Sequence, residues 1–195
     1  MLGLINRSIQ CFLRDSFGPL IWHQVAFQAR LGFDDFEPML SYDDEMTERL
    51  IVAAAAVLQR PREVVLEDLG TYLVSHPNVE ALRRLLRFGG VGFVDFLHSL
   101  EDLPERGRLA LPDLELPLLE VCDLGQDDYL LRCAPMVQGV GHVMVGLLRA
   151  MADDYGALVL LEHGGDMTGG EVVRVRILDQ RHTAGRRFKL ALGAG

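Results

Sequence analysis

Apolar residues in the first half of the chain recur at helical spacing. One such stripe runs from Leu2 to Leu13 and closes at Gly18, after which Pro19 suits the first turn of a second helix. Further stripes follow caps or prolines, and they predict helices that begin near Ser41, Pro61, Pro77 and Phe93. The amino-terminal half is therefore predicted to be helical.

The pattern changes after Pro117. The segments 118–122 and 129–133 flank a turn containing Gly125, which is typical of a β-hairpin. Residues 138–155 carry a strong helical stripe, and two further strands follow at 157–163 and 171–178, joined by a Gly-rich turn. Helices followed by a β-β-α-β-β order predict an α+β fold with a small antiparallel sheet. We expect a single domain over residues 1–182, with a helical lobe to about 60 and an α/β lobe from about 61, and then a frayed tail at 183–195.

Composition narrows the classes of function. The 195 residues are 49% hydrophobic and 24% charged, as in a folded globular protein. The net charge of −9 argues against a nucleic-acid partner, because phosphate contacts need clustered cations. No apolar run reaches the length of a membrane span, and no signal peptide is recognisable. The three cysteines show no CxxC spacing, which favours a reducing, cytoplasmic setting.

One position stands out within the helix near Phe93. Its apolar stripe includes Phe96, Leu97 and Leu100, and one further turn brings the stripe to position 104. That position is therefore predicted to face the interior. The residue there is Pro104, which has no side-chain donor or metal ligand and resists a helix interior.

The segment FLHSLEDLPERGRLALPDLELP, which ends at Pro117, resembles the signature of the haem nitric oxide/oxygen-binding (H-NOX) family. The opening MLGLINRSIQ and the segment FEPMLSYDDEMTERLI extend this resemblance over nearly the whole chain. It implies an H-NOX-like fold, a haem cofactor and a role in sensing. In this resemblance Ile5 is at a haem-contact position and Pro117 matches a proline that packs against the porphyrin. Pro104 falls where the family has the histidine that ligates iron.

The family's second hallmark is a Tyr-x-Ser-x-Arg run that holds the haem propionates. The matching residues here are Cys133, Pro135 and Val137, so the resemblance implies that both the axial ligand and the propionate clamp are replaced. A buried carboxylate without a partner costs several kcal/mol. The sequence therefore predicts a haem site that has lost its usual means of holding haem.

Four other side chains carry an atom that could ligate iron in place of the family histidine. His98 and His142 lie off the apolar stripes of their helices, so we expect them at the surface. His23 is expected to be a partly buried core histidine of the helical lobe. Cys133 could offer a thiolate, although buried cysteines are usually inert.

These observations predict a ligand-binding sensor module with a degenerate haem site that signals to a separate protein of the histidine kinase or cyclase class. One alternative is a haem-based NO/O₂ sensor with a substitute axial ligand. Another is a structural remnant with a collapsed pocket. Because a full-sized dry void would cost about as much as a domain's whole stability, either Ile5, Leu97, Leu100, Pro117 and Met144 meet across a closed gap or another apolar molecule occupies it, and we expect collapse. No P-loop, GxSxG or HExxH motif indicates an enzyme.

Overall fold

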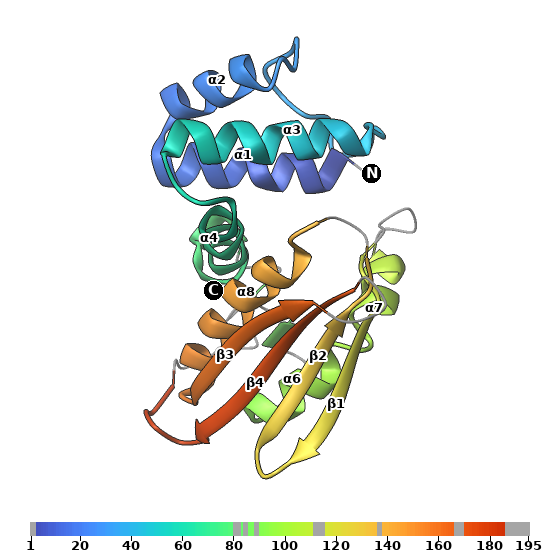
Figure 1. Ribbon diagram of the computed structural model, residues 1–195, viewed down its shortest axis with the longest axis vertical. Helices are drawn as coiled ribbons and strands as arrows, with labels where there is room; N and C mark the ends of the chain where they lie inside the picture. The colour runs from blue at the N-terminus through green and yellow to red at the C-terminus, as the bar shows by residue number, and fades with distance from the viewer. Residues whose placement is uncertain are drawn as a thin grey trace, which may run out of the picture.

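The computed structural model describes residues 3–79, 83, 86–87, 90–110, 116–135, 138–165 and 170–185. Figure 1 shows a layer of helices stacked above two packed helices and a four-stranded sheet. The predicted α+β class is confirmed. Val137 and most of the predicted tail lie outside the described residues, and the single-domain boundaries remain a prediction.

The upper layer consists of α1 (Gly3–Phe17), α2 (Pro19–Gln28) and α3 (Asp44–Leu58). Gly18 joins the first two helices with φ +90°, a conformation that favours glycine, and Pro19 begins α2 as the sequence predicts. The buried side chains Leu13, Trp22 and Leu50 belong to one apolar core. Buried side chains between Val65 and Tyr72, on the helix that follows in the chain, pack into the same core. That core is the first of two.

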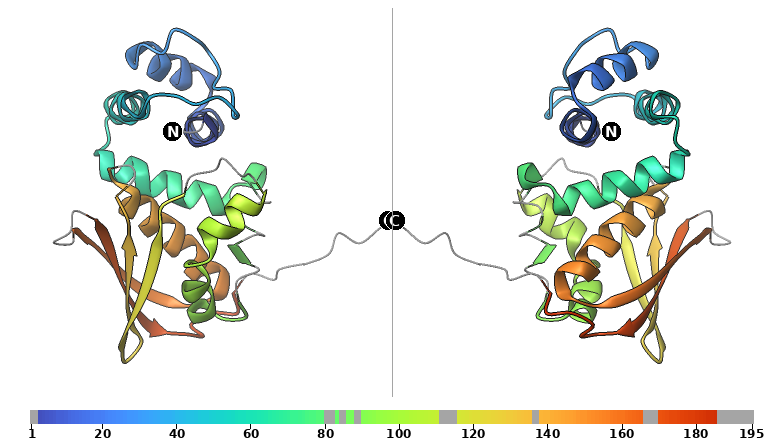
Figure 2. Two further views of the ribbon diagram at one scale, coloured as in Figure 1. Left: turned by 90° about the vertical axis from the view of Figure 1, so that its right-hand side faces the viewer. Right: turned by 90° about the vertical axis from the view of Figure 1, so that its left-hand side faces the viewer.

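The sheet contains β1 (Leu119–Gly125), β2 (Asp128–Cys133), β3 (Leu158–Gly165) and β4 (Glu171–Asp179), in the order β1-β2-β4-β3 with every neighbour antiparallel. The β1–β2 hairpin turns at Gln126 and Asp127, whose φ values of +57° and +59° suit a type I′ turn. Buried β2 and β4 side chains such as Leu131, Val173 and Val175 form the second apolar core together with residues from the helices on that face. Figure 2 shows those helices on one face of the sheet.

Two short helices, α6 (Phe93–Ser99) and α7 (Leu103–Ala110), lead toward the sheet. The helical stripe does not continue as one helix, because residues 100–102 form a break before Pro104, which lies in the first turn of α7 where a missing amide costs little. Pro104 is buried, which confirms that position 104 faces the interior. A one-turn 3₁₀ helix, η1 (Pro77–Val79), precedes this region.

The lobes are joined through α4 (Arg62–Ser75) and α8 (Val140–Tyr155), whose backbones cross in direct contact. A Cβ at Gly70 would overlap the Val143 carbonyl oxygen, and one at Gly146 would overlap the Glu67 carbonyl oxygen. Across the same crossing, Thr71 donates a hydrogen bond to the Gly146 carbonyl at 3.3 Å. Only glycine at positions 70 and 146 allows this separation of the two helices.

Glu171 of β4 caps the amino-terminal end of α8. Its carboxylate accepts hydrogen bonds from the amides of Gly139, at 2.6 Å, and Gly141, at 2.9 Å, and it contacts Nε2 of His163 at 2.9 Å. Burial by itself would raise the pKa of Glu171, but the hydrogen bonds from His163 and the two amides outweigh it and lower the pKa below its ordinary value. The capped end of α8 is thereby fixed against the sheet.

We expect Gly146→Ala to destabilise the fold by about 2 kcal/mol or more, because the added methyl group overlaps backbone that cannot rotate away. Urea unfolding followed by circular dichroism measures this. Gly164→Ala is the matched control: its Cβ would meet only the Val172 side chain at 3.6 Å, an ordinary contact, and should change stability little. Equal stability of the two variants would contradict the close crossing of α4 and α8.

Glu171→Gln tests the cap of α8. Because the folded-state pKa of Glu171 is lowered, the carboxylate contributes stability above its ordinary pKa of 4.5, and this contribution is lost as the pH falls through the lowered value. The variant should lose about 1 kcal/mol at pH 7, and the loss should shrink toward pH 3. Urea unfolding at both pH values checks this, with the exposed Glu162→Gln on β3 as control. A loss that does not vary with pH would contradict the prediction.

Candidate functional site

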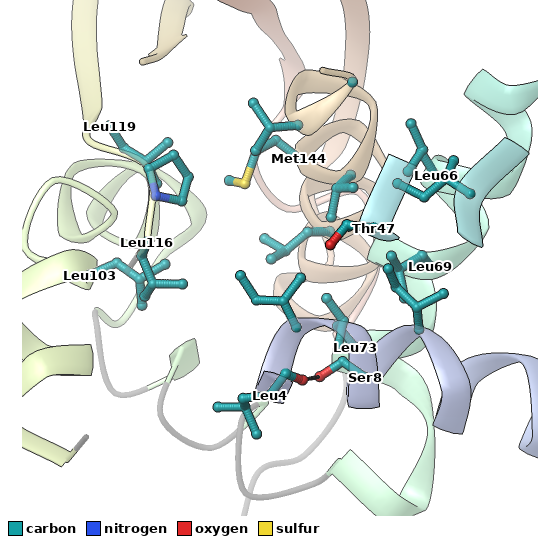
Figure 3. Close-up of a pocket in the computed structure, with 18 of the residues that line it drawn as sticks. Leu4, Ser8, Thr47, Leu66, Leu69, Leu73, Leu103, Leu116, Leu119 and Met144 are labelled. Carbon is teal, nitrogen blue, oxygen red and sulfur yellow. Dashed lines mark hydrogen bonds between the residues drawn. The ribbon is translucent and has the colours of Figure 1, made fainter. Parts of the chain in front are cut away.

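A cavity of about 280 Å³ lies at the boundary of the two lobes. Figure 3 shows aliphatic side chains converging on it from helices of both lobes and from the start of β1. These aliphatic side chains come from six elements, each represented here by one residue: Ile5, Ile51, Leu66, Leu103, Leu119 and Met144. No charged residue and no aromatic ring is present in the described lining.

Helical periodicity accounts for two walls of this cavity. On α4 the lining residues Leu66, Leu69 and Leu73 follow the spacing i, i+3 and i+7, which places them on one face. On α8 the lining residues Val140 and Met144 belong to the stripe seen in the sequence. The stripes that predicted a packed core therefore leave part of their surface facing the cavity.

The polar side chains in the lining are Ser8, Thr47 and Gln138. The Ser8 hydroxyl donates to the Leu4 carbonyl at 2.9 Å, within α1, as drawn in Figure 3. The Thr47 hydroxyl donates to Oδ1 of Asn6 at 2.8 Å. Both hydroxyl hydrogens are thus used inside the protein, and neither is directed at a ligand. Ser8 and Thr47 lie within helical stretches, and no sequence signal singled them out.

The expected collapse of this site is wrong. Ile5, Pro117 and Met144 do face it from different elements, but they line open space. Leu97 and Leu100 are fully buried in the core of the sheet-containing lobe and do not reach it. At about 24 cal/mol per Å³, a dry enclosed cavity of 280 Å³ would cost about 7 kcal/mol, which is an upper bound here because this cavity is partly open to the surface. That amount is comparable with the whole stability of a domain, about 5–15 kcal/mol.

The structure separates the positions that the resemblance assigned to a haem site. Pro104 is buried but does not line the cavity; its neighbours Leu103 and Gly107 on α7 do. Cys133 is buried at the end of β2, where burial and the nearby Glu171 carboxylate raise its thiol pKa to about 12, so a thiolate is absent at neutral pH. Pro135 is exposed beyond that strand.

The three substitute histidines also lie away from the cavity lining. His98 is exposed on α6, as expected, and its ring meets Tyr129 edge-on at 6.0 Å between centroids. His23 is exposed on α2, so the expectation of a partly buried histidine is wrong. His142 is half-buried rather than at the surface.

The half-burial of His142 follows from its neighbours. Its ring stacks on His163 with 3.9 Å between centroids, and its Nδ1 lies 3.5 Å from a carboxylate oxygen of Glu67. This contact links α8 to β3 and α4. Among the described residues no group of three or more His, Cys, Asp or Glu side chains is arranged to hold a metal ion.

The described residues fit an iron-ligated haem poorly. The strongest iron ligand in the described lining is the Met144 thioether, which in cytochromes c serves opposite a histidine. The guanidinium of Arg62 lies beside cavity-lining Gly139, but it is bound to both carboxylate oxygens of Glu48 and, at 2.6 Å, to the Gln138 carbonyl. A cavity of 280 Å³ is less than twice the ~150 Å³ that holds one benzene ring, whereas a porphyrin contains four pyrrole rings.

Known proteins resemble this chain in sequence at low identity. Soluble guanylate cyclase 89Da of Drosophila melanogaster is 19% identical over 194 residues, which is 97% of this chain and 29% of the cyclase. Soluble guanylate cyclase gcy-31 of Caenorhabditis elegans is 23% identical over 154 residues, which is 79% of this chain and 22% of the cyclase. The chain thus spans less than a third of the length of these relatives. Of the helices in the described part of the chain, none has the length and hydropathy needed to cross a bilayer.

Solved structures resemble it in fold. A mutant H-NOX protein from S. oneidensis in the Fe(II) ligation state has a TM-score of 0.77 at 16% identity, covering 93% of this chain and 98% of that one. A mutant of the Cs H-NOX protein has a TM-score of 0.74 at 14% identity, covering 96% and 100%. The model of the haem-NO-binding family matches residues 2–163. The resemblance seen in the sequence is confirmed, and this chain belongs to the haem-NO-binding family.

Proposed function

We propose that this chain is a ligand-binding sensor module of the haem-NO-binding family that does not hold iron-ligated haem and that signals to a separate partner protein. The observation that carries the proposal is the cavity of about 280 Å³ between the lobes. Its described lining is mainly aliphatic, with no histidine nitrogen to ligate iron and no cation for a propionate. The replacement of the family histidine by Pro104 agrees with this lining.

The position of the cavity supports a sensing role. Residues of α1 and α3 form one side of it, and residues of α4, α7 and α8 form the other. A molecule in the cavity would therefore contact both lobes at once. On α7, Leu103 and Gly107 line the cavity while Glu105 and Arg108 are exposed, so one short helix connects the cavity to the surface. We propose this exposed face of α7 as the contact for a histidine kinase or cyclase.

A haem-based NO/O₂ sensor is the second candidate. The observation in its favour is the Met144 sulfur, which faces the cavity in Figure 3 and could ligate iron. His98, His142 and His23 give it no support, because none of them lines the cavity. A purely structural remnant is disfavoured by the energetic cost of keeping the space open.

We expect the protein, expressed with a haem precursor, to be isolated without a sharp Soret band, and hemin to bind weakly without saturation. Pro104→His should raise the hemin affinity only modestly, because position 104 does not itself line the cavity. Combining it with Cys133→Tyr, Pro135→Ser and Val137→Arg should raise the affinity by more than the separate effects, because ligand and clamp act together. Absorption spectra during hemin titration measure this.

The matched control for that titration is Val91→His, which adds a histidine at a side chain that is 98% exposed and should leave hemin binding unchanged. Near-stoichiometric haem in the wild type, with a defined axial ligand, would overturn the proposal. Loss of such a spectrum in Met144→Leu would then identify the thioether as the ligand and favour the second candidate.

The partner contact is tested on α7. Glu105→Lys and Arg108→Glu reverse exposed charges, and each should weaken capture of a histidine kinase or cyclase from the native cell by several-fold. Arg106 is unsuitable, because its side chain donates to the Ser99 carbonyl at 3.0 Å and its reversal would disturb the α6–α7 break. Asp153→Lys, exposed near the end of α8, is the control. Quantitative mass spectrometry reads the capture, and equal recovery with all variants would remove α7 from the interface.

A further inference from the structure

We infer that the cavity binds an uncharged, mainly aliphatic molecule with a single hydroxyl group, and that it discriminates against carboxylates. This inference rests on the proposed function in that it takes the cavity to be a ligand site. It goes further by assigning the chemical class of the ligand. Three properties of the cavity lead to it: its charge, its size and the direction of its hydrogen bonds.

The first property is the absence of a usable cation in the described lining. An ionised carboxylate taken out of water needs a partner that carries charge or donates hydrogen bonds. Arg62, the guanidinium next to Gly139, is already bound to Glu48 and to the Gln138 carbonyl. The Ser8 and Thr47 hydroxyls point their hydrogens at protein acceptors. An anion in this cavity would meet no described cation, and the amide of Gln138, an exposed residue, would be the described polar side chain left to donate to it.

The second property is size. A cavity of about 150 Å³ lined by Leu, Ile and Phe holds benzene, which has six non-hydrogen atoms. In proportion, 280 Å³ holds roughly eleven non-hydrogen atoms. The lining side chains are branched or flexible aliphatic groups, which suit a chain-like molecule better than a planar aromatic one, since no described lining residue offers a ring for stacking. A linear chain of eight to ten carbons with one polar end is of this size.

The third property is the hydrogen bonding of Ser8. Its hydroxyl hydrogen is donated to the Leu4 carbonyl at 2.9 Å, but a hydroxyl oxygen also has two lone pairs that can accept. Ser8 lies in the lining, so its oxygen can accept a hydrogen bond from a ligand. A ligand hydroxyl can donate that bond, whereas an ionised carboxylate has no hydrogen to give. The polar end that fits beside Ser8 is therefore a donor.

Isothermal titration calorimetry with 1-hexanol, 1-octanol and 1-decanol at pH 7.5 tests the assignment. Each should bind one per chain, and the dissociation constant should fall by about fourfold per added methylene up to decanol, the gain from burying one CH₂. Octanoate, which is ionised at this pH, should bind about tenfold or more weakly than octanol. Ser8→Ala should weaken the binding of octanol severalfold. Octane, which has no hydroxyl group, should change the melting temperature of Ser8→Ala and of the wild type by the same amount.

Val143→Phe fills the cavity from α8 and should weaken octanol at least about tenfold, whereas Val52→Phe, on α3 and 53% exposed, should not. Circular dichroism confirms that both fold, and Ile51→Phe replaces Val143→Phe if that variant does not. Octanoate that binds as tightly as octanol overturns the assigned class and leaves the ligand site standing. Absence of saturable alcohol binding also overturns the class. An absorption spectrum that shows one haem per chain would instead overturn the proposed function, on which the assigned ligand class rests.

Discussion

The rest of the structure depends on the direct contact between the backbones of α4 and α8. Gly70 and Gly146 are the residues at which each helix touches the other's carbonyl groups, and no Cβ fits at either position. At this distance the two helices cannot slide past each other, because a close-packed interior has no free space to take up the movement. Both helices also direct an aliphatic face toward the lobe boundary, so this one contact fixes two walls of the cavity.

The other walls are held by ties from α4 to the upper helices. Tyr72 donates a 2.6 Å hydrogen bond to Asp15 of α1, and Arg62 pairs with Glu48 of α3. Each lobe moreover has its own buried core, with Tyr72 in one and Val74 in the other. Closing the cavity would require α1 and α3 to move toward α8 while α4 stays fixed to α8, which would break these ties. The open space is therefore a consequence of how the two cores meet.

Much of this could be predicted from the sequence. Periodicity located the hairpin and the helices other than the one expected from Pro77, much of which lies outside the described residues. The stripe through Phe96 correctly placed position 104 inside. The predictions that were wrong concern contacts between segments that lie far apart in the sequence. The collapse expectation counted aliphatic side chains but had no means to see the glycine contacts that fix α4 against α8. Likewise, the burial of His142 depends on His163 and Glu67, which come from two other elements. The assignments of Pro135 and Val137 as replaced clamp positions remain predictions.

The energetic cost of the cavity also bounds what it can sense. If filling 280 Å³ recovers about 7 kcal/mol, the corresponding dissociation constant is about 10 μM, before the ligand loses its own freedom. Polar contacts would add little to this affinity, because few polar groups in the described lining are positioned to bind a ligand. Under the proposed function, a ligand of this kind would occupy the site at concentrations in the micromolar range or above. Occupancy would then relieve a cost that the lobes otherwise bear together, and under the proposed function α7, which has Leu103 at the cavity and Glu105 at the surface, would connect that relief to the partner.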